Sequence, residues 1–272
     1  ALIGEYALGL VANVLNLRTL RLEAPLSLKD VYKPEEYKRS QLYTYTNTCF
    51  EIVTDSIKLL ILITFWFING FNFLDQLVRG WGFNSVVTGL LYFGILLFFY
   101  MLMTLPFSIY GTFVIEQRFG FNKTVVGTFF LDRVKVLVLT VLFGGPLLVA
   151  VLVFFEHAGK FGWLYGWGVV SLFSLTMAFI FPTWIMPIFN RFNPMEPGGL
   201  KDAIFRYAES VEFEIQNIFV MDGSKRSSKS NAFFSGFGRN RRIALFDTLV
   251  DKHTVTELVA VLAHEIGHYK KK

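Results

Sequence analysis

Four long apolar runs constrain the fold of this chain more than any other feature. They span residues 57–74, 86–110, 136–155 and 162–189, and a weaker fifth run spans residues 1–17. A helix needs about 20 predominantly apolar residues to cross a bilayer. The runs therefore predict a mainly α protein with a polytopic transmembrane helix region. Pro106, Pro182 and Pro187 fall inside two of the runs, where they are expected to kink or end the helices.

Composition excludes the commonest alternative, a water-soluble globular domain. Of the 272 residues, 53% are hydrophobic and only 17% are charged. The single cysteine, Cys49, excludes an intrachain disulfide and a cysteine-based zinc site. Most of the excess positive charge, a net +5, lies on one side of the predicted membrane spans. Nucleic acid is therefore not expected as a partner.

The basic residues are divided unequally between the two sides of the predicted spans. With five spans, residues 18–56, residues 111–135 and everything after residue 189 lie on one side. Ahead of residue 189 that side carries Arg18, Arg21, Lys29, Lys33, Lys38, Arg39, Arg118, Lys123, Arg133 and Lys135, whereas the other side carries only Arg79 and Lys160. By the positive-inside rule, the basic side is cytoplasmic.

Two domains are expected, a transmembrane region at residues 1–189 and a small cytoplasmic α+β domain at residues 190–272. The second begins with a linker rich in proline and glycine. Its pattern predicts a helix over 200–212, strands over 215–221, 232–234 and 242–246, and a solvated loop over 224–230 that contains Arg226. A further helix begins at Thr254, which forms a capping box with Glu257.

The last helix carries the motif His264-Glu265-Ile266-Gly267-His268. Residues four apart face the same way on a helix, so both imidazoles can bind one zinc ion. Glu265 is then placed as general base toward a water whose pKa zinc lowers to about 7. This arrangement predicts peptide-bond hydrolysis, with His264 and His268 as metal ligands and Glu265 as the catalytic residue.

A catalytic zinc site needs a third protein ligand, which the motif does not provide. Either an upstream carboxylate folds back, or the ligand lies beyond Lys272. The second alternative is favoured, because the chain starts without Met and stops four residues after His268, as expected for a longer protein cut at both ends.

Several segments resemble the integral-membrane zinc metallopeptidases that include the CAAX prenyl proteases, or Ste24 endopeptidases. The matching segments are 105–107, 113–122, 182–190, 230–236 and 243–249, followed by the HEIGH motif. The resemblance implies a barrel of seven helices around a chamber, with zinc at its cytoplasmic mouth and a glutamate on a later helix as third ligand. It also implies that Asn231, Ala232 and Phe233 belong to an edge strand that pairs with substrate.

The resulting hypothesis is an integral-membrane zinc metalloendopeptidase that acts on membrane-associated or prenylated (CAAX-type) polypeptides. The expected partners are a peptide or protein substrate and membrane lipid. Short loops and the Tyr-Lys-Lys after the motif resemble prokaryotic members, which favours a bacterial inner membrane; a eukaryotic member is expected in the endoplasmic reticulum. The alternatives are a membrane-protein quality-control protease of the same clan, or a metal-binding transporter or lipid-binding protein. The transporter is disfavoured because the apolar runs hold few ionisable residues.

Overall fold

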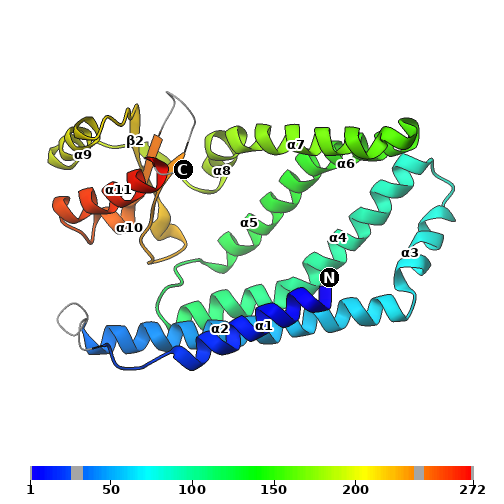
Figure 1. The fold of residues 1–272 in the computed structure, drawn as a ribbon, viewed down its shortest axis with the longest axis horizontal. Helices are drawn as coiled ribbons and strands as arrows, with labels where there is room; N and C mark the ends of the chain where they lie inside the picture. Colours follow the sequence, from blue (N-terminus) through cyan, green and yellow to red (C-terminus); the bar gives the residue numbers. More distant parts are fainter. Residues whose placement is uncertain (1, 26–32, 236–241, 271–272) are drawn as a thin grey trace. The chain divides into compact units, whose positions relative to one another are not determined.

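The structure is a computed structural model that describes residues 2–25, 33–235 and 242–270. The chain forms two compact units, residues 1–120 and residues 121–272. Figure 1 shows that the first unit is built of helices and that the second combines helices with a small sheet.

In residues 2–25 and 33–120, the first unit forms four α-helices, two of which are an antiparallel pair (Figure 1). Its elements are α1 (Leu2–Thr19), α2 (Pro34–Phe67), α3 (Gly70–Arg79), α4 (Ser85–Tyr110) and a π-helical segment (Gly111–Glu116). Helix α1 lies along α2 (Figure 1), and the hydroxyls of Tyr6 and Ser56 are hydrogen bonded at 2.6 Å. Helix α1 is thereby held to α2 near its own N-terminus.

Helices α2 and α3 meet at a bend of 62°. Asn69 adopts a left-handed conformation with φ of 61°, which asparagine tolerates better than most residues. The next residue is Gly70, where a Cβ would overlap the Phe65 ring. The run at 57–74 was predicted as one segment, and these two residues explain why it is broken.

The membrane helices of the second unit, like α4 of the first, contain prolines without ending at them. They are α5 (Val126–Leu139), α6 (Gly145–His157), α7 (Gly162–Ile180) and α8 (Met186–Phe189), with π-helical segments at Thr140–Gly144 and Phe181–Ile185. Pro182 lies within the second π-helical segment, and Pro106 lies inside α4. Pro106 and Pro182 do not end their helices, because local π geometry and neighbouring groups can accommodate a proline in a membrane helix; the expected kink stays a prediction.

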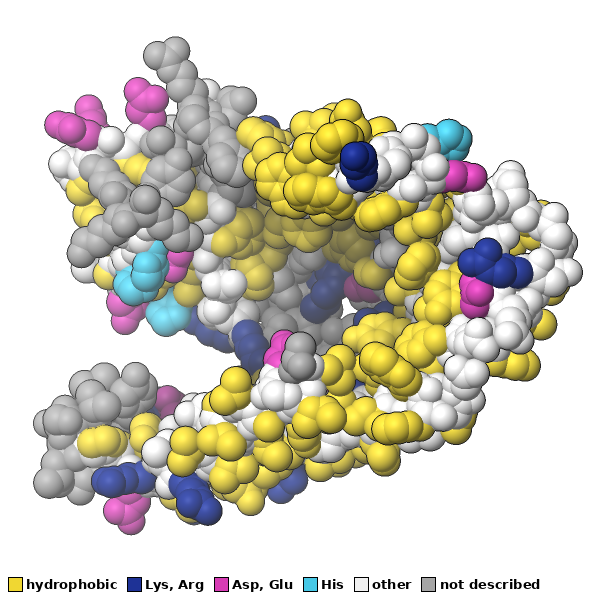
Figure 2. Space-filling view, turned by 45° about the vertical axis from the view of Figure 1, so that its right-hand side comes forward, with side chains coloured by type: hydrophobic (Ala, Val, Ile, Leu, Met, Phe, Trp, Pro, Cys, Tyr) yellow, Lys and Arg dark blue, Asp and Glu magenta, His cyan; other side chains and the backbone are white. Residues whose placement is uncertain are grey.

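Within the described residues, three continuous helices are long and apolar enough to cross a membrane: Ser85–Glu116, Val126–His157 and Gly159–Phe189. The bent pair of α2 and α3 would be a fourth span, and α1 is not among them. Large apolar side chains are exposed along these helices, as Figure 2 shows. Such surface is stable only when lipid or another apolar partner covers it, so the chain is a multi-pass membrane protein.

The second unit contains a four-stranded mixed sheet in the order β1-β2-β4-β3. The strands are β1 (Phe192–Pro194), β2 (Asn217–Met221), β3 (Ala232–Ser235) and β4 (Arg242–Phe246), and the helices around them are α9 (Gly199–Ser210), α10 (Asp247–Val250) and α11 (Val255–Lys270). Strand β2 pairs parallel with β4, and both outer pairs are antiparallel. The predicted helix and strands after residue 199 are confirmed within one or two residues, apart from residues 236–241, which lie outside the described residues.

A small hydrophobic core joins this sheet to α9 and α11. Its most deeply buried members are Ile204, Ile243, Leu245, Leu258 and Leu262. In α11 the buried Leu258, Leu262 and Ile266 are four residues apart and so form one face of the helix. This face fixes the rotation of α11 about its axis.

The loop between β2 and β3 is not the solvated segment expected from the sequence. The Arg226 guanidinium donates to both carboxylate oxygens of Asp132 in α5, at 2.8 and 3.0 Å. It also donates to the Phe189 carbonyl at 2.8 Å and to Asn190 Oδ1 at 3.1 Å. Only 23% of the Arg226 side chain is exposed, so this residue joins the sheet region to α5 and α8.

Candidate metal centre

Helix α11 begins with the capping box predicted from the sequence. The Thr254 backbone N–H and hydroxyl donate to Glu257 Oε2 at 2.8 and 3.0 Å. The hydrogen bond from the Thr254 backbone, followed by that from its hydroxyl, lowers the pKa of Glu257 below its ordinary value. The cap satisfies donors that the first turn of a helix would otherwise leave without a partner.

The two histidines of the motif lie on the exposed face of α11. His264 follows the buried Leu262 by two residues, which is a rotation of about 200° around a helix with 3.6 residues per turn. Because Leu258, Leu262 and Ile266 face the core, His264 and His268 point away from it, and both are exposed. Their Nε2 atoms are 2.9 Å apart, and their ring centroids 4.4 Å.

This separation fits two ligands of one zinc ion. Two imidazole nitrogens, each about 2.0–2.1 Å from a tetrahedral zinc, lie roughly 3.3–3.4 Å from each other. The observed 2.9 Å is about 0.4 Å shorter than that value, a difference that small rotations of the two rings remove. The imidazoles are therefore arranged as two neighbouring ligands, with no backbone change required.

A third ligand is not found beside the two histidines in the described residues. Within residues 2–25, 33–235 and 242–270, no group of three or more His, Cys, Asp or Glu side chains is close enough together to hold a metal ion. A carboxylate that folds back and a ligand beyond Lys272 both stay predictions. Glu265, the third functional residue of the motif, is partly buried beside the histidine face.

The segment predicted to bind substrate lies at one edge of the sheet. Strand β3 is the outermost strand beside β4, and α11 packs against it. Asn231 precedes the strand: its Oδ1 accepts from the Ala232 N–H at 2.9 Å, and its carbonyl accepts from Phe246 N at 3.0 Å. The ring of Phe233 is half-buried and stacks edge-on with that of Phe246. The fold thus brings the edge strand and the motif helix together.

Arg226 is the functional candidate that sequence reasoning missed. Its neighbours Ser224, Lys225, Ser227 and Ser228 have the composition of a surface loop, and no spacing rule links residue 226 to residue 132. The basic residue adjacent to Asp132 in the sequence is Arg133. In the structure, the Arg133 guanidinium lies over the Phe129 ring at 5.0 Å, while Arg226 binds Asp132.

Comparison with known proteins gives consistent matches along the whole chain. Residues 13–191 match the family model described as CAAX prenyl protease N-terminal, five membrane helices, and residues 194–272 match that of peptidase family M48. A CAAX prenyl protease 1 homolog of Oryza sativa subsp. japonica is 34% identical over 93% of this chain and 62% of its own length. CAAX prenyl protease 1 of Saccharomyces cerevisiae is 38% identical over 91% of this chain and 57% of its own length.

A solved structure has the same fold. The crystal structure of S. mikatae Ste24p superposes with a TM-score of 0.90 at 34% identity, over 99% of this chain and 64% of that protein. The chain therefore spans about three fifths of the length of these relatives. With both parts of the chain matched in the family's order, this protein belongs to peptidase family M48, in the group that carries the CAAX prenyl protease N-terminal domain.

Proposed function

We propose that this protein is an integral-membrane zinc metalloendopeptidase that cleaves peptide bonds in membrane-associated polypeptides, prenylated CAAX-type proteins in particular. The observation that carries the proposal is the pair of exposed imidazoles with Nε2 atoms 2.9 Å apart, on a helix that packs against an edge strand. Membership in the family and the names of the two relatives support the same substrate class.

His264 and His268 would hold the metal, and Glu265 would move the proton. Zinc, when bound at such a site, supplies a Lewis acid for the scissile carbonyl and lowers the pKa of a water molecule to about 7. The Glu265 carboxylate accepts the proton that this water loses as its oxygen attacks the carbonyl carbon. The same carboxyl then donates the proton to the leaving amine nitrogen as the carbon–nitrogen bond breaks.

The edge strand would bind the substrate backbone. An extended peptide can pair with an exposed edge through its own backbone groups, whatever its side chains. Ala232 and Phe233 begin β3 and Asn231 directly precedes it, so the peptide would lie beside α11. This mode explains how one site accepts polypeptides of different sequence.

The proposed topology places the metal centre on the cytoplasmic side. The connection between α6 and α7, which carries Lys160, then lies on the opposite side, whereas Lys123 and the sheet region lie in the cytoplasm. The prediction of a bacterial inner membrane rested on short loops, whereas the two curated relatives described above are eukaryotic. We therefore favour the endoplasmic reticulum membrane, with a bacterial inner membrane as the alternative.

The test is hydrolysis of a farnesylated CAAX peptide by the purified protein in detergent, with and without a zinc chelator. Chelation should abolish cleavage. Glu265→Gln should lower kcat by at least about 100-fold, the typical contribution of general acid–base catalysis, while bound zinc stays unchanged. His268→Ala should lose zinc and activity together.

The matched control is His253→Ala, which removes a histidine that lies two residues before α11 and outside the motif. It should change neither zinc content nor kcat. Full cleavage by Glu265→Gln would refute its role as general base, and unaltered zinc content in His268→Ala would refute the metal site. Cleavage of an unprenylated membrane peptide at the same kcat/KM would favour the quality-control alternative.

A further inference from the structure

A cavity of about 1250 Å³ opens among the four helices of the first unit. All of its lining residues belong to α1, α2, α3 and α4, and all lie between residues 2 and 103. Ligand cavities for drug-sized molecules usually measure about 300–1000 Å³. This cavity is larger, as expected for a site that takes a long hydrocarbon chain.

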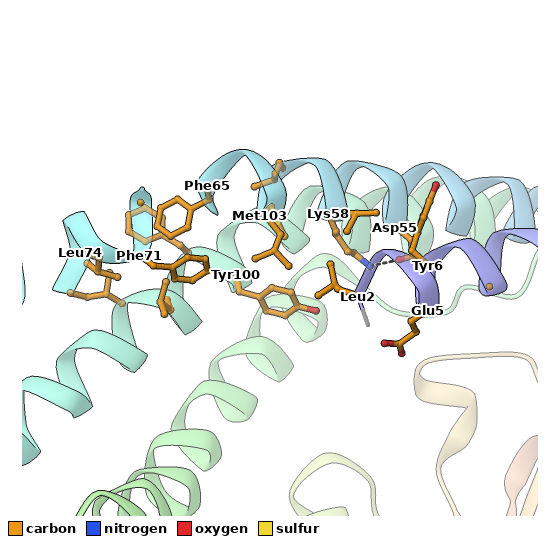
Figure 3. A pocket seen from close by; sticks show the side chains of 18 of the residues that line it. Leu2, Glu5, Tyr6, Asp55, Lys58, Phe65, Phe71, Leu74, Tyr100 and Met103 are labelled. Atoms are coloured by element: carbon orange, nitrogen blue, oxygen red, sulfur yellow. Dashed lines mark hydrogen bonds and ion pairs between the residues drawn. The ribbon is translucent and has the colours of Figure 1, made fainter. Parts of the chain in front are cut away.

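The cavity has an apolar end and a charged end (Figure 3). Phe65, Phe71 and Leu74 lie toward one end, whereas Glu5, Asp55 and Lys58 lie toward the other. This division is that of an amphiphile, with hydrocarbon at one end and a charged head at the other. A water-soluble metabolite or an ion would leave the apolar end without a matching group.

The charged end carries one more carboxylate than ammonium. Lys58 Nζ donates to Asp55 Oδ1 at 3.0 Å, and both side chains keep considerable exposure. Glu5 has no hydrogen bond or ion pair with any residue in the described parts of the chain. Two carboxylates and one ammonium give this end a net charge of −1, complementary to a head group that carries a positive charge.

These charges stand next to the apolar surface of the membrane helices. Asp55 and Lys58 lie where α2 enters its apolar stretch, which continues to Phe67, and Glu5 lies in the first turn of the apolar α1. Charged residues at the edge of apolar membrane segments are costly to keep there, and such residues usually serve binding or transport. Asp55 is paired with Lys58, whereas the exposed carboxylate of Glu5 can accept hydrogen bonds from a bound ligand.

We propose that this cavity binds one molecule of a phospholipid with a primary amine head group. Its acyl chains lie among the aromatic and aliphatic side chains of α2, α3 and α4. Its ammonium donates to Glu5 and Asp55, and its phosphate accepts from Lys58. A primary ammonium has three N–H donors, which a quaternary ammonium lacks, and a head group without a cation would face the excess negative charge. The expected order of affinity is phosphatidylethanolamine, then phosphatidylcholine, then phosphatidylglycerol.

The first test compares three lipids that share palmitoyl and oleoyl chains and differ only in these head groups. Native mass spectrometry of the purified full chain in detergent counts the lipid molecules that stay bound at each concentration. Wild-type protein should bind one phosphatidylethanolamine at least about tenfold more tightly than phosphatidylglycerol, which corresponds to about 1.4 kcal/mol. Glu5→Gln should remove most of this preference, whereas Glu23→Gln, an exposed carboxylate that does not line the cavity, should keep it.

A second pair of variants blocks the space and leaves every charge in place. Gly9 lines the cavity and Gly4 does not, although both lie in α1, and a Cβ at either position meets no neighbouring atom. Gly9→Phe should therefore place a ring in the cavity and lower the amount of bound phosphatidylethanolamine at least about tenfold, while Gly4→Phe should bind as wild type does. Circular dichroism and gel filtration verify that each variant is folded.

Equal retention of the three lipids by wild-type protein overturns the proposal. So does an unchanged preference in Glu5→Gln, or equal binding by the two glycine variants. Farnesol, an uncharged isoprenoid alcohol, serves as the competitor. If it displaces phosphatidylethanolamine from the wild-type protein and from Glu5→Gln equally well, the cavity is an isoprenoid site and the proposal is wrong. None of these measurements depends on hydrolysis or on bound zinc, so they are independent of the proposed peptidase activity.

Discussion

Replacement of Arg226 tests whether the ion pair with Asp132 holds the sheet region to the membrane helices. The Arg226→Met variant keeps most of the aliphatic length of the side chain but removes four hydrogen bonds, two of them to Asp132 and the others to Phe189 O and Asn190 Oδ1. It also leaves the Asp132 carboxylate with the more distant Lys135, at 3.9 Å.

The expected loss of stability follows from burial. Breaking a buried ion pair by removing one partner costs about 3–5 kcal/mol. The two side chains are 23% and 20% exposed, so solvent replaces part of the interaction and the lower end, about 3 kcal/mol, applies. Asp132→Asn keeps the two contacts of Arg226 with residues 189 and 190 and should cost less, about 2 kcal/mol.

The assay is thermal unfolding in detergent, monitored by tryptophan fluorescence, with the two single variants and the double variant. About 3 kcal/mol corresponds to a decrease in Tm of roughly 6–12 °C for a chain of this size. Because the two residues share two hydrogen bonds, the double variant should be at least about 1 kcal/mol more stable than the sum of the single effects predicts. Glu36→Gln is the control: Glu36 and Lys33 form an exposed pair, with side chains 67% and 81% accessible, expected to contribute under about 0.5 kcal/mol. A decrease in Tm no larger than that of the control, or purely additive effects, would refute the reasoning.

Three further predictions concern single residues. Leu262→Ala empties a fully buried position beneath the histidine pair and should cost about 2–5 kcal/mol, seen as a lower Tm and weaker zinc retention. Glu257 has a lowered pKa in the folded protein. Its stabilisation of α11 is therefore present above its unfolded pKa and is lost as the pH falls through its folded pKa. Below neutral pH, the Tm of Glu257→Gln should depend less on pH than that of the wild type. Gly70→Ala should force the Phe65 ring to move at the bend between α2 and α3 and lower the Tm, whereas Gly94→Ala, in an open position of α4, should not lower it.

The elements that the sequence predicted well depend on local patterns. Apolar length identified three of the spans, and the capping box of Thr254 and Glu257 identified the start of α11 within one residue. The spacing of His264 and His268 placed two imidazoles on one helix face. The face that carries the two histidines is exposed because another face of α11 is buried. Leu258 and Leu262 on that buried face are also four residues apart and point away from the histidines.

The features that the sequence did not predict depend on contacts between distant residues. The pair of Asp132 and Arg226 spans 94 positions. The cavity charges were missed for a related reason, since Asp55 lies just outside the apolar run that begins at residue 57 and Glu5 lies in the weaker run at residues 1–17. Only the folded helices bring Glu5 next to Asp55 and Lys58.

The loop between β2 and β3 is also bonded to α10, the helix that precedes α11. Ser224 N donates to Asp247 Oδ1 at 2.8 Å, and Thr248 Oγ1 donates to the Lys229 carbonyl at 2.9 Å, so both ends of the loop are bonded to α10. Helix α10 ends four residues before Thr254, where the cap of α11 begins. Loss of Arg226 therefore acts on both sides of the loop. It releases α5 and α8 on one side, and on the other it loosens the segment that sets where α11 starts. Since a metal site tolerates only small ligand displacements, zinc retention should fall in Arg226→Met before the sheet itself unfolds.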